Sequence, residues 1–529
     1  MPHDSTSHTY LLQRVALVVV IIVALIAHVL PSPRTIDDAF ITFRYSRNIV
    51  SGEGFVYNPG VRTLGTTTPL YTLLMAGMSL LAGGQDFPWY ALTINALAAA
   101  ATAALLFLLL KRVTNSLWLG TLIGLLWDIS PTSVTFAVGG MEKAVNILWL
   151  VGATYFFITD RPVWMGVFIG LAFLTRIDSV LWFGPLLLYQ FGEKLLAWRR
   201  GDTPTNAGLS GLIPWHTWLA AVLVTAPWLL FAWAYFGSPV PNSLSAKSVA
   251  YIMPSGSAFM TFFRAYIVPF SESQLLGGTG VMVILIFYLL LLIAGILWMV
   301  RHYPRLLPLI IYPWLYLIVF SVMNPLIFRW YLAPPLPALM MTLLIGLWRI
   351  VEALRSKSRI PALVVAGAVS LLWISTSLFG WKLQPDHGPQ RPAPEMAWHQ
   401  IELYYEQIGR RLRDDYGVTA ETRVGSADIG AIGYFSGATI VDTVGLVTPE
   451  LSRYYPVDPA LILHDQNYAI PPQLIYDTAP EYLVTMEAFV RLGLETEAEF
   501  HERYVLDTEI PTDFYGTGMR LYKAVEPQS

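Results

Sequence analysis

The chain has 529 residues, of which 55% are hydrophobic and only 13% are charged, and its mean hydropathy is +0.53. This composition excludes an ordinary soluble globular protein, in which about a quarter of the residues are charged, and it indicates an integral membrane protein. The net charge of −3 is the sum of two unlike parts, because residues 1–384 carry 23 Lys and Arg against 13 Asp and Glu, whereas residues 385–529 carry 10 against 23. We therefore expect a polytopic transmembrane domain over 1–384 and a soluble domain over 385–529.

Eleven apolar runs approach or reach the length of about 20 helical residues that crosses a bilayer. They cover residues 11–30, 88–110, 116–134, 143–159, 162–176, 179–198, 216–236, 281–300, 305–323, 330–349 and 360–380. The fold class predicted is an α-helical polytopic membrane protein with about eleven transmembrane helices. The apolar run 69–82 has only 14 residues, and runs of about 10 to 14 are more often interfacial or re-entrant. Its length leaves open whether it crosses.

The basic residues predict the orientation of these spans. If the run 69–82 does not cross, the basic clusters of the loops fall on one side of the membrane. They are Lys111, Arg112, Arg161, Lys194, Arg199, Arg200, Arg301, Arg305, Arg349, Arg355, Lys357 and Arg359. This side is predicted to be cytoplasmic, together with the N-terminus. The first extracytoplasmic loop, 31–87, and the C-terminal domain then lie outside. The run 11–30 lacks an A-x-A site before Pro31 and is expected to be an uncleaved anchor.

The segment just after the first span, residues 35–48, is predicted to form an interfacial helix that begins with two carboxylates, Asp37 and Asp38. One interpretation is that these acids only cap the helix and interact with its positive end. The other is catalytic, because a carboxylate so close to a bilayer is costly unless it meets water, metal or a polar substrate. Adjacent carboxylates point about 100° apart on a helix, so one can face a reaction cavity while the other supports it. Arg44 shares the face of Asp37.

Further polar residues lie at the outer ends of the predicted spans. The long loop after this helix contains the turn residues Tyr57 and Asn58, and loops of more than about 12 to 15 residues are usually functional or disordered. Isolated polar residues also occur near the predicted outer ends of later spans: Glu142 and Lys143, Arg176 and Asp178, Arg329, and Asn242 with Lys247. Headgroup contact, snorkelling or a structural ion pair would explain each of them separately. Cations on the outer face oppose the usual topology bias, however, and favour an anionic partner such as a lipid phosphate.

The C-terminal part begins after Trp381 with a linker-like stretch at 384–389. A helix is predicted over 401–412, and short strands are predicted over 423–427, 439–442 and 481–484, so this part is expected to be a small α/β domain. Its glycines lack the spacing of a dinucleotide-binding loop. Nothing in the chain resembles a nucleic-acid surface.

No metal site is assigned from the sequence. The chain has no cysteine, and its nine histidines are scattered without a zinc-binding spacing. A divalent metal held by Asp37, Asp38 or Glu142 together with a phosphate has no support from any motif and is left open.

Taken together, these stretches of sequence resemble recurring motifs of the GT-C superfamily of polyprenyl-phosphate-sugar-dependent membrane glycosyltransferases. The stretch Asp37–Tyr45, followed by Gly52–Gly60, is similar to the first extracytoplasmic loop of the terminal β-(1→2) arabinofuranosyltransferases of actinobacterial cell-wall synthesis. The later stations of that group are matched in order by 140–142, 175–178, 241–243 with Lys247, 329–331 with Pro334 and Pro337, 428–435 and 441–446.

The resemblance implies an inverting transfer of a sugar, a pentose such as arabinofuranose or a hexose such as mannose, from a polyprenyl-phosphate donor. The acceptor would be a glycan, lipid or protein of the cell envelope, on the outer face of a bacterial cytoplasmic membrane. Asp37 or Asp38 would be the general base, with a narrow preference for Asp37. Phosphate stabilisation falls to Arg176, Lys247 and Arg329. Substrate positioning falls to Arg44, Tyr57, Asn58, Glu142, Asp178 and Asn242.

Two other functions are compatible with this composition. The first is a lipid or sugar transporter or flippase, although many such folds show inverted repeats and midplane charges, and neither is visible here. The second is a non-catalytic membrane protein whose acidic C-terminal part binds envelope glycans. It predicts no dependence on Asp37 and Asp38.

Overall fold

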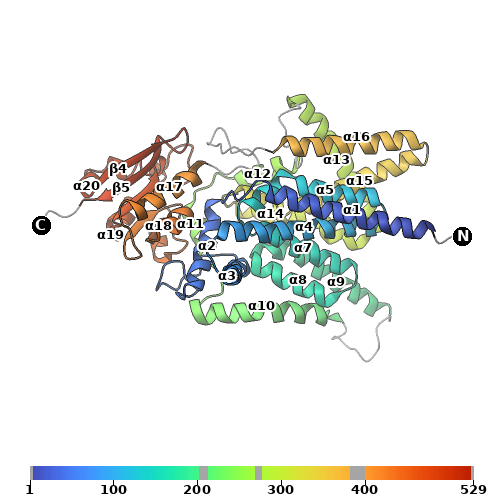
Figure 1. The fold of residues 1–529 in the computed structure, drawn as a ribbon, viewed down its shortest axis with the longest axis horizontal. Coiled ribbons are helices and arrows are strands. Elements are labelled where there is room, and N and C mark those ends of the chain that lie inside the picture. Colours follow the sequence, from blue (N-terminus) through green and yellow to red (C-terminus); the bar gives the residue numbers. More distant parts are fainter. Residues whose placement is uncertain (1–3, 202–211, 268–276, 382–399, 526–529) are drawn as a thin grey trace.

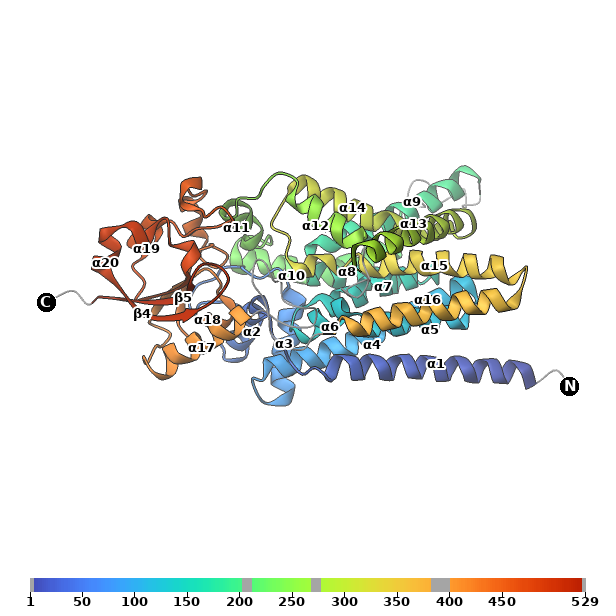
Figure 2. The ribbon, with the colours of Figure 1, turned by 90° about the horizontal axis from the view of Figure 1, so that it is seen from above.

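The computed structural model describes residues 4–201, 212–267, 277–381 and 400–525. Most of its helices run along the long axis of the molecule, and a sheet region occupies one end (Figures 1 and 2). The N-terminus lies at the end opposite the sheet. The predicted linker at 384–389 and the predicted boundary between residues 384 and 385 lie outside the described residues.

The helical body contains sixteen α-helices in the described ranges. They are α1 (Asp4–Val29), α2 (Asp37–Val50), α3 (Pro69–Ala82), α4 (Phe87–Thr114), α5 (Leu117–Ile129), α6 (Pro131–Val138), α7 (Lys143–Ile158), α8 (Pro162–Thr175), α9 (Val180–Arg199), α10 (Trp215–Phe236), α11 (Asn242–Ala250), α12 (Ser257–Ile267), α13 (Gly277–His302), α14 (Leu307–Met323), α15 (Leu336–Arg355) and α16 (Arg359–Phe379). Two short 3-10 turns matter for the site, η1 (Ile177–Ser179) and η5 (Arg329–Leu332).

Seven helices in the described part are long and apolar enough to cross a membrane, namely α1, α4, α10, α13, α14, α15 and α16. The pair α5 and α6 would add one span that bends by 48°, where Pro131 interrupts the backbone hydrogen bonds. The helices α3, α7 and α8 are apolar but shorter. The chain is thus a multi-pass membrane protein. Each of the eleven predicted runs coincides with a helical segment, but the number that cross stays a prediction.

The predicted span 330–349 is displaced in the structure. The helix α15 begins only at Leu336, after the 3-10 turn η5 and Pro334 and Pro335. Proline has no backbone N–H and its ring clashes with the preceding turn of a helix, so a proline pair permits a helix to start but not to continue through it. The displacement leaves 329–335 as irregular backbone beside the candidate site.

The C-terminal region is a five-stranded mixed sheet with short helices. It comprises α17 (Gln400–Asp414), β1 (Arg423–Ser426), α18 (Gly430–Ser436), β2 (Thr439–Asp442), α19 (Pro472–Thr478), β3 (Tyr482–Met486), α20 (Ala498–Arg503), β4 (Tyr504–Pro511) and β5 (Gly518–Ala524). The strand order is β2-β1-β3-β5-β4, with β2, β1 and β3 parallel and β5 antiparallel to its two neighbours. The predicted helix and three predicted strands are present, whereas β4 and β5 were not predicted.

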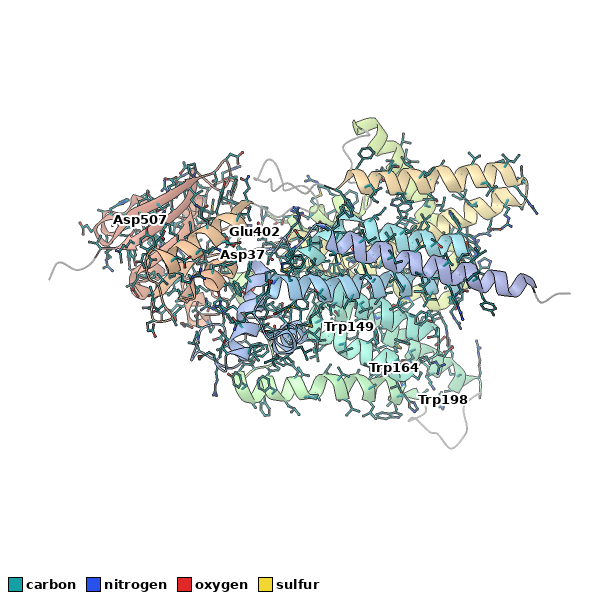
Figure 3. All side chains as sticks on the ribbon, viewed as in Figure 1. Asp37, Trp149, Trp164, Trp198, Glu402 and Asp507 are labelled. Atoms are coloured by element: carbon teal, nitrogen blue, oxygen red, sulfur yellow. The ribbon has the colours of Figure 1, made fainter. Side chains whose placement is uncertain are left out.

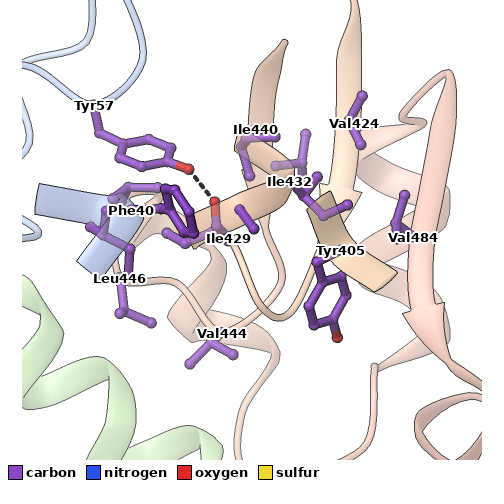
Figure 4. Packing of buried hydrophobic residues seen from close by; sticks show 14 of the residues in the cluster. Phe40, Tyr57, Tyr405, Val424, Ile429, Ile432, Ile440, Val444, Leu446 and Val484 are labelled. Atoms are coloured by element: carbon purple, nitrogen blue, oxygen red, sulfur yellow. Dashed lines mark hydrogen bonds between the residues drawn. The ribbon is translucent and has the colours of Figure 1, made fainter. Parts of the chain in front are cut away.

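One buried cluster joins the C-terminal region to the first extracytoplasmic loop. Phe40 of α2 and Tyr57 of the loop belong to the same cluster as Ile429, Ile432 and Val444 of the C-terminal region (Figure 4). The two parts of the chain therefore share a hydrophobic core, and α2 lies between them.

Candidate active site

A cavity of about 350 Å³ opens beside α2, at the end of the helical body that faces the sheet. Its walls come from seven segments of the helical body and from one residue of the C-terminal region, Leu446. The polar and charged residues in its lining are Asp38, Thr42, Thr66, Thr67, Thr68, Glu142, Arg176, Asp178, Ser243, Lys247 and Tyr331. The remaining lining is largely apolar and includes Leu181, Val319, Phe320, Met323 and Trp330. A largely apolar cavity that also contains charged groups is suited to an amphiphilic ligand.

Asp38 and Lys247 form an ion pair in this cavity. The Lys247 Nζ lies 3.5 Å from the Asp38 Oδ2, and the two side chains keep 27% and 29% of their surface exposed. The ammonium also lies 4.9 Å from the centroid of the Phe328 ring. At this distance and exposure the pair can open to admit a ligand, with the carboxylate free to accept a proton and the ammonium free to meet an anion.

Four charged groups in the wall form a closed network. The Glu142 Oε1 accepts a hydrogen bond from the Lys143 Nζ at 2.5 Å and from the Arg176 Nη1 at 2.7 Å. Arg176 also donates from Nε and Nη2 to the two carboxylate oxygens of Asp178, both at 2.8 Å. Two cations thus balance two carboxylates in a buried setting, which satisfies the groups but leaves no surplus charge.

Asp37 lies on a different face of α2 from Asp38. Its carboxylate oxygens accept hydrogen bonds from the backbone N–H groups of Gly430, at 3.0 Å, and Ala431, at 2.7 Å. Burial, together with the nearby Asp428 carboxylate, raises the pKa of Asp37 to about 8. The side chain therefore joins α2 to the start of α18 rather than lining the cavity.

Arg44, Tyr57 and Asn58 also lie away from the cavity lining. Arg44 is fully buried and donates to the carbonyls of Gly433 and Ala438, each at 2.6 Å, and to Tyr57 O at 2.9 Å. The Tyr57 Oη donates to the Ile429 carbonyl at 2.5 Å (Figure 4). Asn58 pairs with the backbone of Ile440 in β2 through both its side-chain oxygen and its side-chain nitrogen. These three predicted positioning residues connect the first loop to the C-terminal region.

Asn242 and Arg329 are the remaining predicted residues. The Asn242 Nδ2 donates to the carbonyls of Gly445 at 2.6 Å and Leu446 at 3.0 Å, which fixes the start of α11 and hence the position of Lys247. Arg329 begins η5 and is absent from the cavity lining, whereas Trp330 and Tyr331, which follow it, are part of that lining.

Several residues that line the cavity have no role predicted from the sequence. They include Thr66–Thr68 of the first loop and Trp330 and Tyr331, which follow Arg329. Leu446 lies in one of the C-terminal motifs that carried the resemblance. Asp428, in another of these motifs, lies near Asp37 and not in the cavity lining. Burial raises the pKa of Asp428, and its carboxylate accepts a hydrogen bond from the Tyr405 hydroxyl at 2.6 Å. An alternation of apolar and polar residues could not have shown that the C-terminal region reaches the cavity.

Metal ligation has little geometric support. In the part of the chain that the structure describes, no group of three or more His, Asp or Glu side chains could hold a metal ion.

Parts of the sequence resemble known proteins. Residues 394–523 match a family described as a domain of unknown function, DUF8728. A terminal beta-(1->2)-arabinofuranosyltransferase of Mycobacterium tuberculosis is 28% identical over 234 residues, which are 40% of this chain. The matched part is 35% of that relative, so the likeness spans about a third of its length.

Solved structures resemble the chain along its whole length. The crystal structure of ArnT from Cupriavidus metallidurans bound to undecaprenyl phosphate covers 99% of both chains, with a TM-score of 0.57 and 12% identity. ArnT in the apo state covers 98% of both chains, with the same TM-score and 13% identity. At such identities the likeness shows a common fold, extending over the helical body and the sheet region together.

Proposed function

From the GT-C fold that this chain shares with ArnT, we propose that it is a membrane glycosyltransferase that takes its sugar from a polyprenyl-phosphate donor. The observation that carries the proposal is the Asp38–Lys247 pair in an apolar cavity beside the first extracytoplasmic loop. Undecaprenyl phosphate is bound in one ArnT crystal structure, and the relative from Mycobacterium tuberculosis is named as an arabinofuranosyltransferase. The first supports this donor class, and the second supports the transfer of a sugar. The sugar is a pentose or a hexose, and the acceptor is an envelope glycan, lipid or protein.

Asp38 is the general base in this proposal. Its carboxylate takes the proton of the acceptor hydroxyl while the acceptor oxygen bonds to the anomeric carbon. The bond from that carbon to the phosphate oxygen breaks on the opposite face, and the lipid phosphate leaves with the electron pair. General-base help of this kind contributes about 10² to 10⁴ in rate. The transfer inverts the anomeric configuration because attack and departure occur on opposite faces.

The preference between the two aspartates follows from their hydrogen bonds. Both carboxylate oxygens of Asp37 are held by backbone N–H groups, and its side chain lies on the far side of α2 from the cavity. Asp38 lines the cavity and is partly exposed. The sequence favoured Asp37 narrowly, whereas the geometry supports Asp38 as base and Asp37 as a connection to α18.

Lys247 is the cation that we assign to the departing phosphate. It lines the cavity on α11, and its present partner, Asp38, is a partly exposed carboxylate that can release it. A cation placed where charge develops is worth most in a site from which water is excluded. Arg176 contacts the same cavity, but its guanidinium is already bound by Glu142 and Asp178, so we assign these three residues to shaping the wall. Asn242 positions Lys247.

The apolar part of the cavity suits the lipid of the donor. Leu181 of α9 and Val319, Phe320 and Met323 of α14 form this part of the lining. An isoprenoid chain that enters from the bilayer loses no apolar environment on such a surface and makes dispersion contacts with these side chains. The charged groups gathered nearby would then meet the phosphate and sugar.

Orientation completes the proposal. The basic clusters of the loops support an orientation with the N-terminus inside and with the cavity, the first loop and the C-terminal region outside. The transfer then occurs on the outer face of the bacterial cytoplasmic membrane, where envelope acceptors are located.

The test is transfer from labelled polyprenyl-phosphate sugars, pentose and hexose, by purified full-length protein in lipid nanodiscs. We expect Asp38→Asn to lower the transfer rate by about 10² to 10⁴, because Asn cannot accept the proton. Asp160→Asn is the matched control, since that carboxylate side chain is 71% exposed and far from the cavity. Asp37→Asn should retain the transfer chemistry. Transfer that survives Asp38→Asn undiminished would exclude the base assignment. Binding of the donors without transfer to any acceptor would favour the transporter.

A further inference from the structure

A second pocket, of about 320 Å³, lies on the other side of α2 from the cavity. It is bounded by residues 33–35 after α1, the loop 85–88 before α4, and the helices α17 and α18. On α2, Asp38, Ile41 and Thr42 face the cavity, whereas Phe40 faces this pocket. The two hollows thus share one helix as a wall and open at the same end of the helical body.

Glu402 is the residue that marks this pocket as a binding site. It lines the pocket from the first turn of α17 and is only 7% exposed. Its Oε2 has no hydrogen-bond partner among the described residues. Burial, with the Asp37 carboxylate nearby, raises the pKa of Glu402 well above its ordinary value. Burial thus favours the protonated acid, which can both donate and accept a hydrogen bond. Figure 3 labels Glu402 and Asp37 at the junction of the helical body and the sheet region. A buried polar atom left unsatisfied is costly, and a ligand hydroxyl would satisfy it.

The other lining residues narrow the chemistry of the ligand. The ring of Phe40 packs against those of Tyr434 and Phe435, with centroids 5.1 and 5.0 Å apart, and forms an apolar wall. Asp86 and the Glu406–Arg410 ion pair, 2.8 Å apart, supply fixed polar groups. Besides Glu402, the carboxylates of Asp86 and Glu406 match the guanidinium groups of Arg34 and Arg410 in number, so the lining offers no surplus positive charge to a phosphate or another anion. An apolar wall opposite convergent acceptors and donors is suited to a neutral polyhydroxylated ring.

We propose that this pocket binds a sugar residue of the acceptor glycan, at a distance from the hydroxyl that reacts in the cavity. The volume is at the lower end of the range of about 300 to 1,000 Å³ for ligand pockets and suits one or two sugar rings. The pocket lies beside the cavity across a single helix, so a glycan chain that leaves the cavity around the end of α2 can reach it. The identification of the bound sugar as part of the acceptor rests on the proposed function, whereas the binding of a sugar in this pocket does not.

The test separates binding from turnover. Full-length protein carrying Asp38→Asn, in nanodiscs, is applied to an array of defined neutral oligosaccharides of pentofuranoses and hexoses, two to six units long. We expect Glu402→Gln, which replaces the acid by an amide, and Leu403→Trp, which fills the pocket from α17, each to weaken binding at least about tenfold. Glu502→Gln, an exposed carboxylate on α20, is the matched control and should bind as its parent does. Equal apparent melting temperatures confirm that the variants are folded.

The outcomes distinguish the two proposals. Glycan binding that is insensitive to both Glu402→Gln and Leu403→Trp would contradict the assignment of this pocket as a glycan-binding site. The same holds if a protein that transfers sugar binds none of the oligosaccharides. If these two substitutions weaken glycan binding in a protein that transfers no sugar, the binding site is supported and the proposed glycosyltransferase function is contradicted. With Asp38 restored, we expect Glu402→Gln to raise the KM for oligosaccharide acceptors about tenfold, whereas Glu502→Gln should leave this KM unchanged.

Discussion

Asp37 and Asp38 are adjacent in the sequence, yet they meet different surroundings because successive helical residues point about 100° apart. Asp38 faces Lys247 and the cavity, whereas Asp37 faces the first backbone N–H groups of α18. The N-terminal end of a helix favours a carboxylate, but burial and Asp428 oppose its charge, and the pKa of Asp37 rises to about 8 as a result. One residue is thus suited to proton transfer and the other to holding two elements together.

This raised pKa predicts a pH dependence of stability. The folded protein keeps the Asp37 proton over the range from 3.8 to about 8, in which the unfolded chain releases it. The contribution of Asp37 to stability is therefore lost as the pH rises through this range and is constant above it. We expect the apparent melting temperature of the parent in nanodiscs to fall more steeply between about pH 5 and about pH 8 than that of Asp37→Asn. The same pH slope in both proteins would show that this group does not titrate in that window.

At the scale of the element, α2 acts through two faces. The face with Asp38 and Thr42 forms a wall of the cavity, and the face with Asp37, Phe40 and Arg44 contacts the C-terminal region. This contact is very close, since a Cβ at Gly430 would lie 1.8 Å from the Asp37 carbonyl oxygen. Gly430, one of the glycines that gave no nucleotide-binding spacing, is therefore explained by the close approach of two backbones, whereas a Cβ at Gly433 would meet the side chains of Tyr57 and Arg44.

A substitution at Gly430 tests this close approach. In Gly430→Ala the new methyl group must push α18 away from α2, because the nearest atoms are backbone atoms that cannot rotate aside. We expect a loss of about 1 to 3 kcal/mol in stability and faster tryptic cleavage of the C-terminal region. Gly367→Ala in α16 is the control, since a Cβ there meets no atom within 4 Å. An unchanged cleavage rate in Gly430→Ala would contradict the packing of these two helices.

At the scale of the whole molecule, the cavity belongs to neither part of the chain alone. Its walls come from the helical body and from Leu446 of the C-terminal region, and Asn242 holds the loop that carries Leu446. The sheet region and the helical body also share a hydrophobic core. The C-terminal region is thus expected to influence both the shape of the cavity and access to the second pocket.

The proposed orientation can be tested with single cysteines, because the chain contains none of its own. The exposed residues Glu53, Glu502 and Lys357 are suitable positions. A membrane-impermeant thiol reagent should label Glu53→Cys and Glu502→Cys in intact cells but Lys357→Cys only after permeabilisation, as the positive-inside rule predicts. Labelling of Lys357→Cys in intact cells would reverse the orientation.

The sequence by itself determined the membrane class, the helical segments, the α/β character of the C-terminal part and the residue stations of a GT-C protein. These features depend on hydropathy, charge and short motifs, which are local along the chain. Only the tertiary structure separated the roles of Asp37 and Asp38, because the groups that bind Asp37 lie 393 and 394 positions away. For the same reason, only the structure showed that Arg44, Tyr57 and Asn58 form hydrogen bonds with the C-terminal region. It also brought Glu402 to a second pocket. Burial and hydrogen-bond partners are properties of the packed chain, and they decide what each polar residue can do.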